Sequence, residues 1–274
     1  MAPGTLYLCP TPLGNLEDVT LRVLRTLREA DKIAAEDTRH TRKLLSHYNI
    51  HTPLVSYHEH NKKAKTALLI NWLQEGQTIA LVSDAGTPAI SDPGEELVQA
   101  AIARNLPVVS LPGPTALITA LTASGLPVCP FAFYGFLPSR GKEKKAMLEK
   151  ILAEEKTVIF YEAPHRLQKT LAALKQADGN RRVVVARELT KMHEEYHRGT
   201  LAEIADYFAA VPPRGECTVL LEAAAPKDMP QMDIEALAAE FLAKGLSTRE
   251  AAREVARLTG LSRNEVYQKI IKKK

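Results

Sequence analysis

The chain has 274 residues, of which 45% are hydrophobic and 25% are charged, and its formal net charge is +4. This length supports a full hydrophobic core, usually in two domains, and the composition is that of a soluble globular protein. The first ten residues lack the basic and apolar regions of a signal peptide, and no apolar run approaches the roughly 18 residues of a membrane-spanning helix. We therefore expect a cytoplasmic protein.

The three cysteines, Cys9, Cys129 and Cys217, are an odd number and widely spaced, and none belongs to a Cys-x-x-Cys motif. This pattern predicts that the cysteines are buried, act as small apolar residues in a reducing compartment, and form neither a disulfide nor a zinc site. No His-Glu-x-x-His or similar spacing occurs either, so the sequence gives no metal site.

Short apolar runs alternate with helical patterns along the first half of the chain. The expected strands are 6–9, 32–35, 54–57, 79–82 and 108–111, and the expected helices are 21–29, 42–48, 64–74, 97–104 and 116–123. Strands that alternate with helices predict a parallel sheet with right-handed crossovers.

The loop after residues 79–82 is longer than usual for a strand-to-helix connection, which normally takes about 2–6 residues. Gly86 permits a positive φ and close backbone approach, and Pro88 and Pro93 stiffen the loop. Ligands of open α/β sheets bind outside the carboxyl ends of the strands, so a ligand is expected here. The alternative interpretation is an ordinary connection closed by the turn at 92–94.

The second half predicts a mixed sheet. The expected strands are 131–135, 157–161, 182–186, 193–199 and 217–222, and the expected helices are 142–154, 164–177 and 201–208. Turn-forming residues cluster at 124–127, and 224–230 has the composition of a linker. The predicted division is an N-terminal α/β domain at 1–124, a C-terminal α/β domain at 125–225, and a basic helical segment at 232–274.

The last segment contains two capping boxes, Ser247 to Glu250 and Ser262 to Glu265, on either side of Gly260, which outlines a helix-turn-helix. Its expected apolar stripes consist of Val255, Leu258, Val266, Ile270 and Ile271. Residues 244–274 hold nine Lys/Arg and three Asp/Glu, a net charge of +6; subtracting +6 from +4 leaves −2 for the rest of the chain. Such local basicity fits nucleic-acid binding, and a solvated helical tail is the alternative.

Several nucleotide-binding and hydrolase motifs are missing. The first loop has the single glycine Gly14 in place of Gly-x-Gly-x-x-Gly, which disfavours a standard dinucleotide fold. Gly141-Lys142 lacks the context of a phosphate-binding loop, and no Gly-x-Ser-x-Gly occurs.

Six segments, in order, resemble the motifs of one family. They are Pro-Thr-Pro-Leu-Gly-Asn-Leu at 10–16, Ala-Glu-Asp-Thr-Arg-His-Thr at 35–41, Val-Ser-Asp-Ala-Gly-Thr-Pro at 82–88, Leu-Pro-Gly-Pro at 111–114, Phe-Tyr-Glu-Ala-Pro-His-Arg at 160–166 and Ala-Arg-Glu-Leu-Thr-Lys at 186–191. The chain thereby resembles the RsmI family, bacterial 16S ribosomal RNA 2′-O-ribose cytidine methyltransferases of the tetrapyrrole-methylase-like superfamily.

That resemblance implies two α/β domains, a C-terminal helical extension, S-adenosylmethionine in the interdomain cleft, and a homodimer. The cofactor-binding positions it implies are Leu13, Asp84, Ala85, Gly86, Ala89, Thr115, Ala116, Glu162 and Glu188. The chain departs from the wider superfamily where Asp84-Ala85-Gly86-Thr87 replaces Gly-Gly-Asp-Pro.

The chemistry requires a group that accepts the proton of the ribose hydroxyl. Asp37, directly after the strand 32–35, is the first candidate, and its position matches an acidic catalytic residue of some tetrapyrrole methylases; His40 is the second. The alternative role of Asp37 is to cap the following helix with Arg39 as its ion-pair partner. His58, Glu59 and His60 are expected in an exposed loop.

The resulting hypothesis is methyl transfer to the 2′-hydroxyl of a cytidine in 16S ribosomal RNA, and we expect the substrate to be the assembled small ribosomal subunit. Two alternatives remain open from the sequence: a methylase of a tetrapyrrole or other small metabolite, and a non-catalytic nucleic-acid-binding regulator that senses a metabolite.

Overall fold

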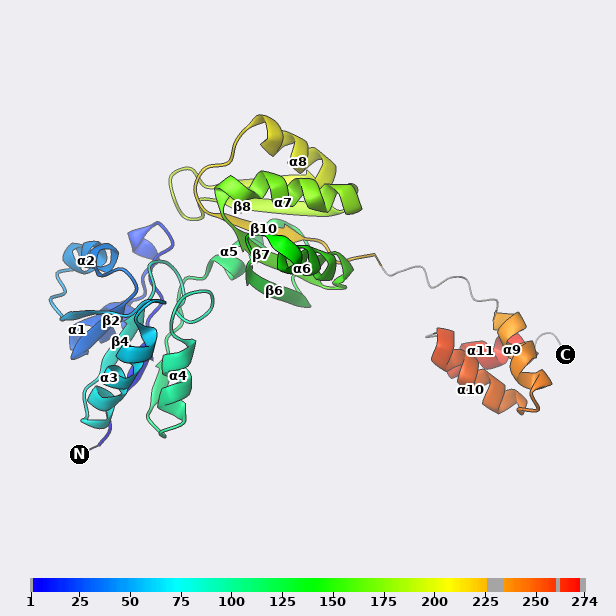
Figure 1. The fold of residues 1–274 in the computed structure, drawn as a ribbon, viewed down its shortest axis with the longest axis horizontal. Helices are drawn as coiled ribbons and strands as arrows, with labels where there is room; N and C mark the ends of the chain where they lie inside the picture. Colours follow the sequence, from blue (N-terminus) through cyan, green and yellow to red (C-terminus); the bar gives the residue numbers. More distant parts are fainter. Residues whose placement is uncertain (1, 226–233, 260–261, 272–274) are drawn as a thin grey trace. The chain divides into compact units, whose positions relative to one another are not determined.

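The computed structural model describes residues 2–225, 234–259 and 262–271 (Figure 1). The chain forms two compact units, Met1–Ala223 and Ala224–Lys274. The predicted linker at 224–230 and the turn at Gly260 lie largely or wholly outside the described residues.

The first sheet is parallel and has the strand order β3-β2-β4-β1-β5. Its strands are β1 (Leu6–Leu8), β2 (Lys32–Ala35), β3 (Leu54–Ser56), β4 (Ile79–Val82) and β5 (Val108–Ser110). All four residues of β4 are buried, as the short apolar run predicts for a central parallel strand. The carboxyl ends of β2, β4, β1 and β5 therefore meet at one edge of the sheet, where a ligand site is expected.

Helices cover both faces of this sheet. They are α1 (Leu21–Glu29), α2 (Thr38–His47), α3 (Lys62–Gln74) and α4 (Glu95–Ile102), with a short 3-10 helix, η1 (Leu16–Asp18), before α1. Side chains of α1 and α2 pack into one core with Ile33 and Val82, and those of α3 and α4 pack into another with Ile79 and Leu81. Alternate residues of β4 thus enter opposite cores, as the period of a strand requires.

The predicted start of the second helix at residue 42 is wrong. Helix α2 begins at Thr38, because the Asp37 side chain accepts a hydrogen bond from the Arg39 backbone amide and caps the first turn. By contrast, the Thr20 cap of α1 is confirmed, since its side chain accepts from the Val23 amide at 3.1 Å.

The second sheet is mixed and has the strand order β6-β7-β10-β8-β9, in which only the pair β6–β7 is parallel. Its strands are β6 (Phe131–Phe136), β7 (Thr157–Glu162), β8 (Arg182–Arg187), β9 (Glu195–Thr200) and β10 (Cys217–Leu221). The predicted mixed sheet is confirmed, including the extended segment that became β9.

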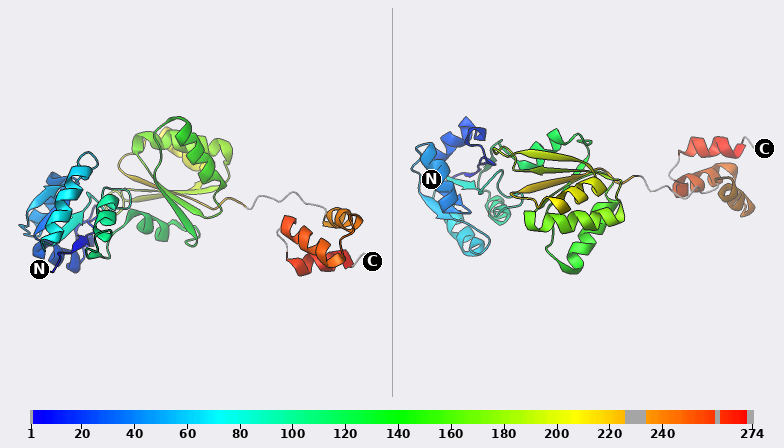
Figure 2. Two further views of the ribbon diagram at one scale, coloured as in Figure 1. Left: turned by 60° about the horizontal axis from the view of Figure 1, so that its bottom comes forward. Right: turned by 90° about the horizontal axis from the view of Figure 1, so that it is seen from above.

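Helices lie on both faces of this second sheet too (Figures 1 and 2). They are α6 (Gly141–Ala153), α7 (Pro164–Ala177) and α8 (Leu201–Ala210) on one face and α5 (Ala116–Ser124) on the other. Leu117 and Leu121 of α5 pack against Ile159 of β7, although α5 directly follows the first sheet in sequence. The predicted domain boundary at residue 124 stays a prediction, and α5 is the element that links the two sheets.

The second unit contains three helices within the described residues, α9 (Ile234–Ala243), α10 (Thr248–Thr259) and α11 (Arg263–Ile271). Figure 2 shows them gathered into one bundle. Both predicted capping boxes form: Ser247 and Glu250 exchange hydrogen bonds, as do Ser262 and Glu265. The sequence did not predict α9, whose Ala238 is buried in the shared core.

Burial in this bundle follows the predicted stripe in part. Val255, Val266 and Ile270 are buried, whereas Ile271 is 41% exposed and does not share the buried face of α11 with Val266 and Ile270. The Leu258 side chain lies outside the described part of the chain.

The cysteine prediction is correct for Cys9 and Cys217, which are buried, and wrong for Cys129, which is exposed. Cys129 lies in the connection between α5 and β6 and in no strand, so the packing of the sheet does not bury it. Among the described residues, no helix is both long and apolar enough to cross a membrane.

Candidate active site

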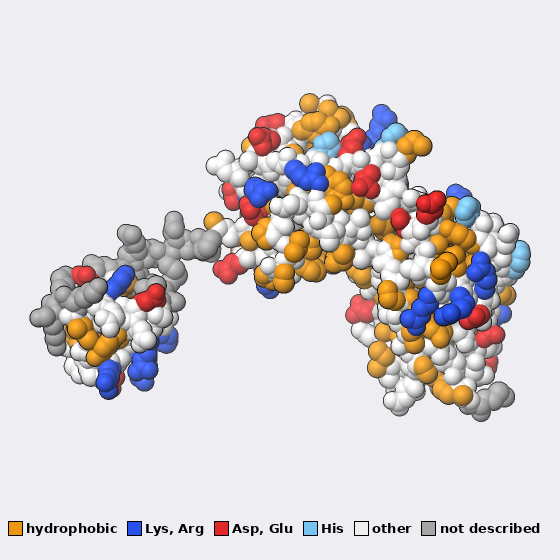
Figure 3. All heavy atoms as spheres, turned by 180° about the vertical axis from the view of Figure 1, so that it is seen from behind, with side chains coloured by type: hydrophobic (Ala, Val, Ile, Leu, Met, Phe, Trp, Pro, Cys, Tyr) orange, Lys and Arg blue, Asp and Glu red, His pale blue; other side chains and the backbone are white. Residues whose placement is uncertain are grey.

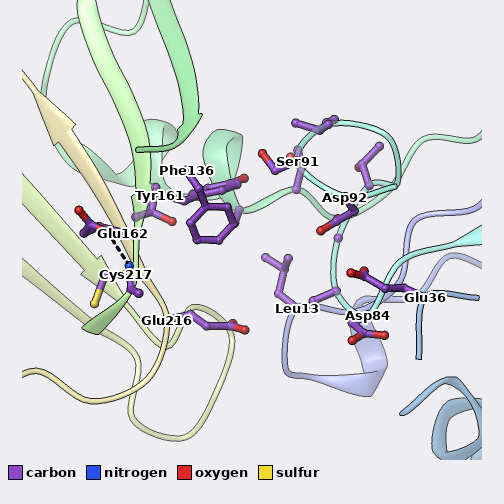
Figure 4. Close-up of a pocket in the computed structure, with 18 of the residues that line it drawn as sticks. Leu13, Glu36, Asp84, Ser91, Asp92, Phe136, Tyr161, Glu162, Glu216 and Cys217 are labelled. Atoms are coloured by element: carbon purple, nitrogen blue, oxygen red, sulfur yellow. Dashed lines mark hydrogen bonds between the residues drawn. The ribbon is translucent and has the colours of Figure 1, made fainter. Parts of the chain in front are cut away.

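A cavity of about 360 Å³ opens at the carboxyl ends of the first sheet's strands, and the ends of β6, β7 and β10 form its opposite wall. It is lined by Leu13, Glu36, Asp84, Ala85, Gly86, Thr87, Ile90, Ser91, Asp92, Thr115, Ala116, Phe136, Tyr161, Glu162, Ala163, Pro164, Glu216, Cys217 and Thr218. Figure 4 shows Glu36, Asp84 and Asp92 on one side of this pocket and Phe136, Tyr161 and Glu216 on the other. Its volume falls within the range of small-molecule and cofactor sites.

The long loop after β4 is held by its two neighbouring loops. Thr11 and Gly86 form an isolated bridge with backbone hydrogen bonds of 2.9 Å in both directions, and the Thr11 hydroxyl donates to the Ser83 carbonyl. On the other side, the Thr87 hydroxyl donates to the Pro114 carbonyl at 2.9 Å. Gly86 adopts φ +78, which a side chain would strain. The loop is therefore a fixed wall, and the interpretation as an ordinary connection does not account for it.

Three carboxylates, from Glu36, Asp84 and Asp92, form the acidic side of the pocket. Burial, followed by the charges of Asp92 and Asp84, raises the pKa of Glu36 to about 7. Burial also raises the pKa of Asp92 to about 6, against a hydrogen bond from Ser83 that lowers it. Repulsion among half-buried carboxylates makes this wall a good place for a bound cation and for a proton.

Glu162 lines the pocket from β7, but its own side chain is fully buried. Its carboxylate accepts hydrogen bonds from the Thr170 hydroxyl at 2.6 Å and the Ala163 amide at 3.0 Å, and pairs with Arg166 at 2.5 Å and Lys144 at 3.7 Å. With no exposed surface, this carboxylate fixes the turn from β7 into α7, and its residue meets the cavity through the backbone.

The opposite wall also contains an aromatic pair. The rings of Phe136 and Tyr161 lie with centroids 5.3 Å apart and tilted, and Phe136 is 57% exposed. Burial raises the pKa of Tyr161 to about 12, so its hydroxyl is neutral and can donate a hydrogen bond. Such a pair offers a flat apolar surface to a ring of a ligand.

The structure brings seven of the nine predicted cofactor positions into the pocket lining: Leu13, Asp84, Ala85, Gly86, Thr115, Ala116 and Glu162. Ala89 and Glu188 lie outside it. Ala89 has φ +66 within the same loop. Glu188 accepts from the Glu216 backbone amide and from Lys191 Nζ, each at 3.0 Å, and so positions Glu216, which does line the pocket.

Neither predicted catalytic residue lines the pocket. The Asp37 carboxylate accepts hydrogen bonds from the Arg39 guanidinium at 3.1 Å and from the Arg39 backbone amide at 2.8 Å, and these bonds lower the pKa of Asp37 to about 2. This is the arrangement of the alternative interpretation, a helix cap paired with Arg39. His40 is exposed on α2. A catalytic role for either residue stays a prediction.

Several lining residues were not singled out from the sequence, chiefly Glu36, Asp92, Phe136 and Glu216. Glu36 directly follows the buried strand β2, so its place at the carboxyl end of a strand made it as good a candidate as its neighbour Asp37. Asp92 was considered only as part of a closing turn, and Phe136 lies one residue beyond the expected strand.

Comparison with known proteins agrees with this geometry. The family description "Tetrapyrrole (Corrin/Porphyrin) Methylases" matches residues 5–205, and "RsmI C-terminal HTH domain" matches residues 228–274. A protein of Synechocystis sp. named "Ribosomal RNA small subunit methyltransferase I" is 49% identical over 269 residues, which cover 97% of this chain and 96% of that protein. The chain belongs to this methyltransferase family. A relative of the same name in Bacillus subtilis is 47% identical over 271 residues, covering 96% of this chain and 93% of the relative.

Solved structures share the fold of the family. A cobalt precorrin-4 methyltransferase matches with a TM-score of 0.62 at 17% identity, over 80% of this chain and 94% of that one. A uroporphyrin-III C-methyltransferase from Thermus thermophilus, complexed with S-adenyl homocysteine, matches with a TM-score of 0.58 at 21% identity, over 80% and 97%. The predicted tetrapyrrole-methylase-like α/β architecture with a C-terminal helical extension is confirmed, and the structure has two sheets.

Proposed function

We propose that this protein transfers a methyl group from S-adenosylmethionine to the ribose 2′-hydroxyl of a cytidine in 16S ribosomal RNA. The observation that carries the proposal is the pocket itself: in a chain of this methyltransferase family, four of the six sequence motifs supply lining residues to the two walls of one cavity. The reaction needs a held methyl donor, an acceptor hydroxyl in line with it, and a group that takes the hydroxyl proton.

The residues present fit such a cofactor. Gly86 lines the pocket and has no side chain to stand between its backbone and a ligand, and a Cβ at this position would lie 3.2 Å from Leu13. The acidic side of the pocket suits a cationic sulfonium, and the ring pair of Phe136 and Tyr161 suits a flat base. When bound, the cofactor supplies the methyl group as an electrophile. We assign its binding to the loop Asp84 to Gly86, to Leu13, to Thr115 and Ala116, and to the Glu162 backbone.

A row of basic side chains on α10 favours RNA as the substrate. Arg249, Arg253 and Arg257 recur every four residues and are exposed, on the side of α10 away from the buried Ala252 and Val255. Figure 3 shows basic side chains gathered on the surface of this unit. Such a row matches the phosphate backbone of a nucleic acid. A small metabolite makes no use of it.

The proposal has three further parts. The methyl acceptor is the RNA of the assembled small ribosomal subunit. The active enzyme is a homodimer, and it acts in the cytoplasm. The experiment is transfer of a tritiated methyl group to undermethylated small subunits, free 16S ribosomal RNA and a tetrapyrrole precursor, followed by mapping of the modified nucleotide. We expect a 2′-O-methylcytidine in the RNA. Transfer to the tetrapyrrole alone, or methylation on a base nitrogen or carbon, would refute the proposal.

A further inference from the structure

The pocket contains a carboxylate whose task the cofactor does not explain. Glu36 lies at the carboxyl end of β2 and lines the cavity beside Asp84 and Asp92 (Figure 4). Its side chain is half-buried and is hydrogen-bonded by the Asp84 backbone amide, so it is held in place. Its neighbour Asp37 caps α2 outside the pocket, so one of the two adjacent acids has a structural contact with α2 and the other, Glu36, lines the cavity.

We propose that Glu36 is the general base of the methyl transfer and receives the proton of the ribose 2′-hydroxyl. The inference rests on the proposed function. In the step, the ribose oxygen forms its bond to the methyl carbon, and the bond between sulfur and that carbon breaks with its electron pair left on sulfur. The hydroxyl proton moves to a carboxylate oxygen of Glu36, which then releases it to solvent.

The acidity of Glu36 suits this task. A general base works best when its pKa lies near the working pH, and the pKa of Glu36 is raised to about 7, whereas Arg39 lowers the pKa of Asp37 to about 2. At pH 8 most Glu36 is ionised, yet its conjugate acid is weak enough to hold a proton. Asp37 at its lowered pKa is a far poorer proton acceptor.

Burial is the main cause of the raised pKa of Glu36, and the charges of Asp92, Asp84 and Asp37 raise it further. Asp84 and Asp92 face it from the loop between β4 and α4, Asp37 adjoins it in the chain, and Glu162 and Glu216 complete the titratable acids of the far wall. Asp84 and Asp92 each have a partner: Asp84 accepts from the Asp37 amide, and Asp92 from Ser83. These two shape the charge around Glu36.

Attraction of a carboxylate to the sulfonium cannot by itself explain a rate effect of Glu36. Positive charge on sulfur falls as the methyl group leaves, so a carboxylate near it favours the bound cofactor more than the transition state. Attraction therefore appears in the dissociation constant, and proton transfer appears in the rate. This difference separates the two roles experimentally.

The test compares the full-length protein with Glu36→Gln and Asp37→Asn in single-turnover methylation between pH 5.5 and 9. We expect the wild-type rate to rise tenfold per pH unit below about pH 7 and then level off. Glu36→Gln should lower the plateau by about 10²-fold or more and abolish the rise, with the Kd of the cofactor and the KM of the RNA changed by less than about threefold. Loss of the rise in Asp37→Asn with its retention in Glu36→Gln would overturn the proposal.

Asp92→Asn provides a second, graded comparison. Removing its charge should lower the pKa of Glu36, so the rise should move to lower pH and remain, because one member of a coupled pair still titrates. An exposed acid at the end of α1 serves as the matched control, and Glu29→Gln should leave the profile unchanged. A profile abolished by Asp92→Asn and kept in Glu36→Gln would transfer the role to Asp92 and refute the proposal.

The pH dependence of thermal stability tests the titration of Glu36 without methyl transfer and without cofactor. A carboxyl with a raised pKa stabilises the fold below its unfolded pKa of about 4.5, and this contribution is lost as pH rises through about 7. Glu36→Gln should therefore raise the Tm at pH 8 relative to wild type and lose this advantage below pH 4.5. An unchanged Tm difference across this range would contradict a titrating Glu36. Wild-type protein that binds cofactor but methylates no RNA at any pH would instead refute the proposed function.

Discussion

The backbone amide of Asp37 donates a 3.0 Å hydrogen bond to Oδ1 of Asp84, which ties the end of β2 to the loop after β4. The Asp84 amide in turn hydrogen-bonds the carboxylate of Glu36. Two hydrogen bonds thus continue to join the segments after the adjacent parallel strands β2 and β4, beyond their last paired residues, Ala35 and Val82. The acidic side of the pocket is built into the sheet edge, and its charges are held at fixed positions.

This fixed charge gives the first prediction. Asp84→Asn keeps an oxygen acceptor for the Asp37 amide but removes a negative charge from the pocket. We expect calorimetry to show about fivefold weaker binding of S-adenosylmethionine, which corresponds to roughly 1 kcal/mol of lost attraction. S-adenosylhomocysteine lacks the sulfonium charge, so its affinity should change by less than twofold. Equal weakening of both ligands would mean that Asp84 acts through loop geometry alone.

The second prediction concerns Gly86, which has φ +78 and would bring a Cβ to 3.2 Å from Leu13. Gly86→Ala should lower the free energy of unfolding by about 1–2 kcal/mol through left-handed strain and weaken cofactor binding about tenfold. Gly125 has the same φ of +78 with nothing within 4 Å of an added Cβ, which makes it a matched control. Gly125→Ala should lower the free energy of unfolding by about as much as Gly86→Ala and leave the cofactor affinity unchanged. If both variants bind equally well, Gly86 does not approach the ligand.

Glu162 supplies the third prediction, because its buried carboxylate holds two cations and two hydrogen bonds. Glu162→Ala leaves Arg166 and Lys144, whose side chains are only 18% and 16% exposed, without their partner. We expect the free energy of unfolding, measured in urea, to fall by about 3 kcal/mol. The control pair is Lys145 with Glu149, also four residues apart but 82% and 66% exposed, and Glu149→Ala should cost less than about 1 kcal/mol. A cost for Glu162→Ala no larger than the control would show that its ion pairs are dispensable.

Local pattern was enough to predict most of the fold. Buried strands such as β4 are continuous apolar runs, and caps such as Thr20 and the Ser247 box are short-range signals, so each is visible within a few residues. The packing of α5 on the second sheet was not predictable in the same way. Its contacts join Leu121 to residues of β7, β8 and β10 far along the chain, and no local pattern encodes which sheet a helix covers.

The site shows the same limit at the scale of one residue. Glu36 and Asp37 are adjacent acids after one strand, and the sequence does not tell which of them enters the pocket. The structure separates them because Asp37, with φ −112 and ψ 109, is still extended and turns its carboxylate to the first turn of α2. Neighbouring side chains of an extended segment face opposite sides, so the cap formed by Asp37 leaves Glu36 on the pocket side.

The last prediction tests the basic row on α10. Replacing Arg249, Arg253 and Arg257 by Gln should weaken binding to 16S RNA and reduce the slope of log affinity against log salt by roughly 2, at about 0.7 per phosphate contact on single strands. The main thermal transition should remain, because the first unit ends at Ala223. A chain that ends after Ala225 should lose more RNA affinity and still bind the cofactor.

The control removes the same charge elsewhere. Lys142, Lys145 and Lys156 are exposed basic residues on or next to α6, and their replacement by Gln lowers the net charge equally. Only the α10 variant should show the smaller salt slope and the weaker transfer to the small subunit, because a local contact depends on position whereas a net-charge effect does not. Equal losses in the two variants would assign RNA binding to overall charge. An unchanged slope in the α10 variant would mean that this row is only a solvated helix surface.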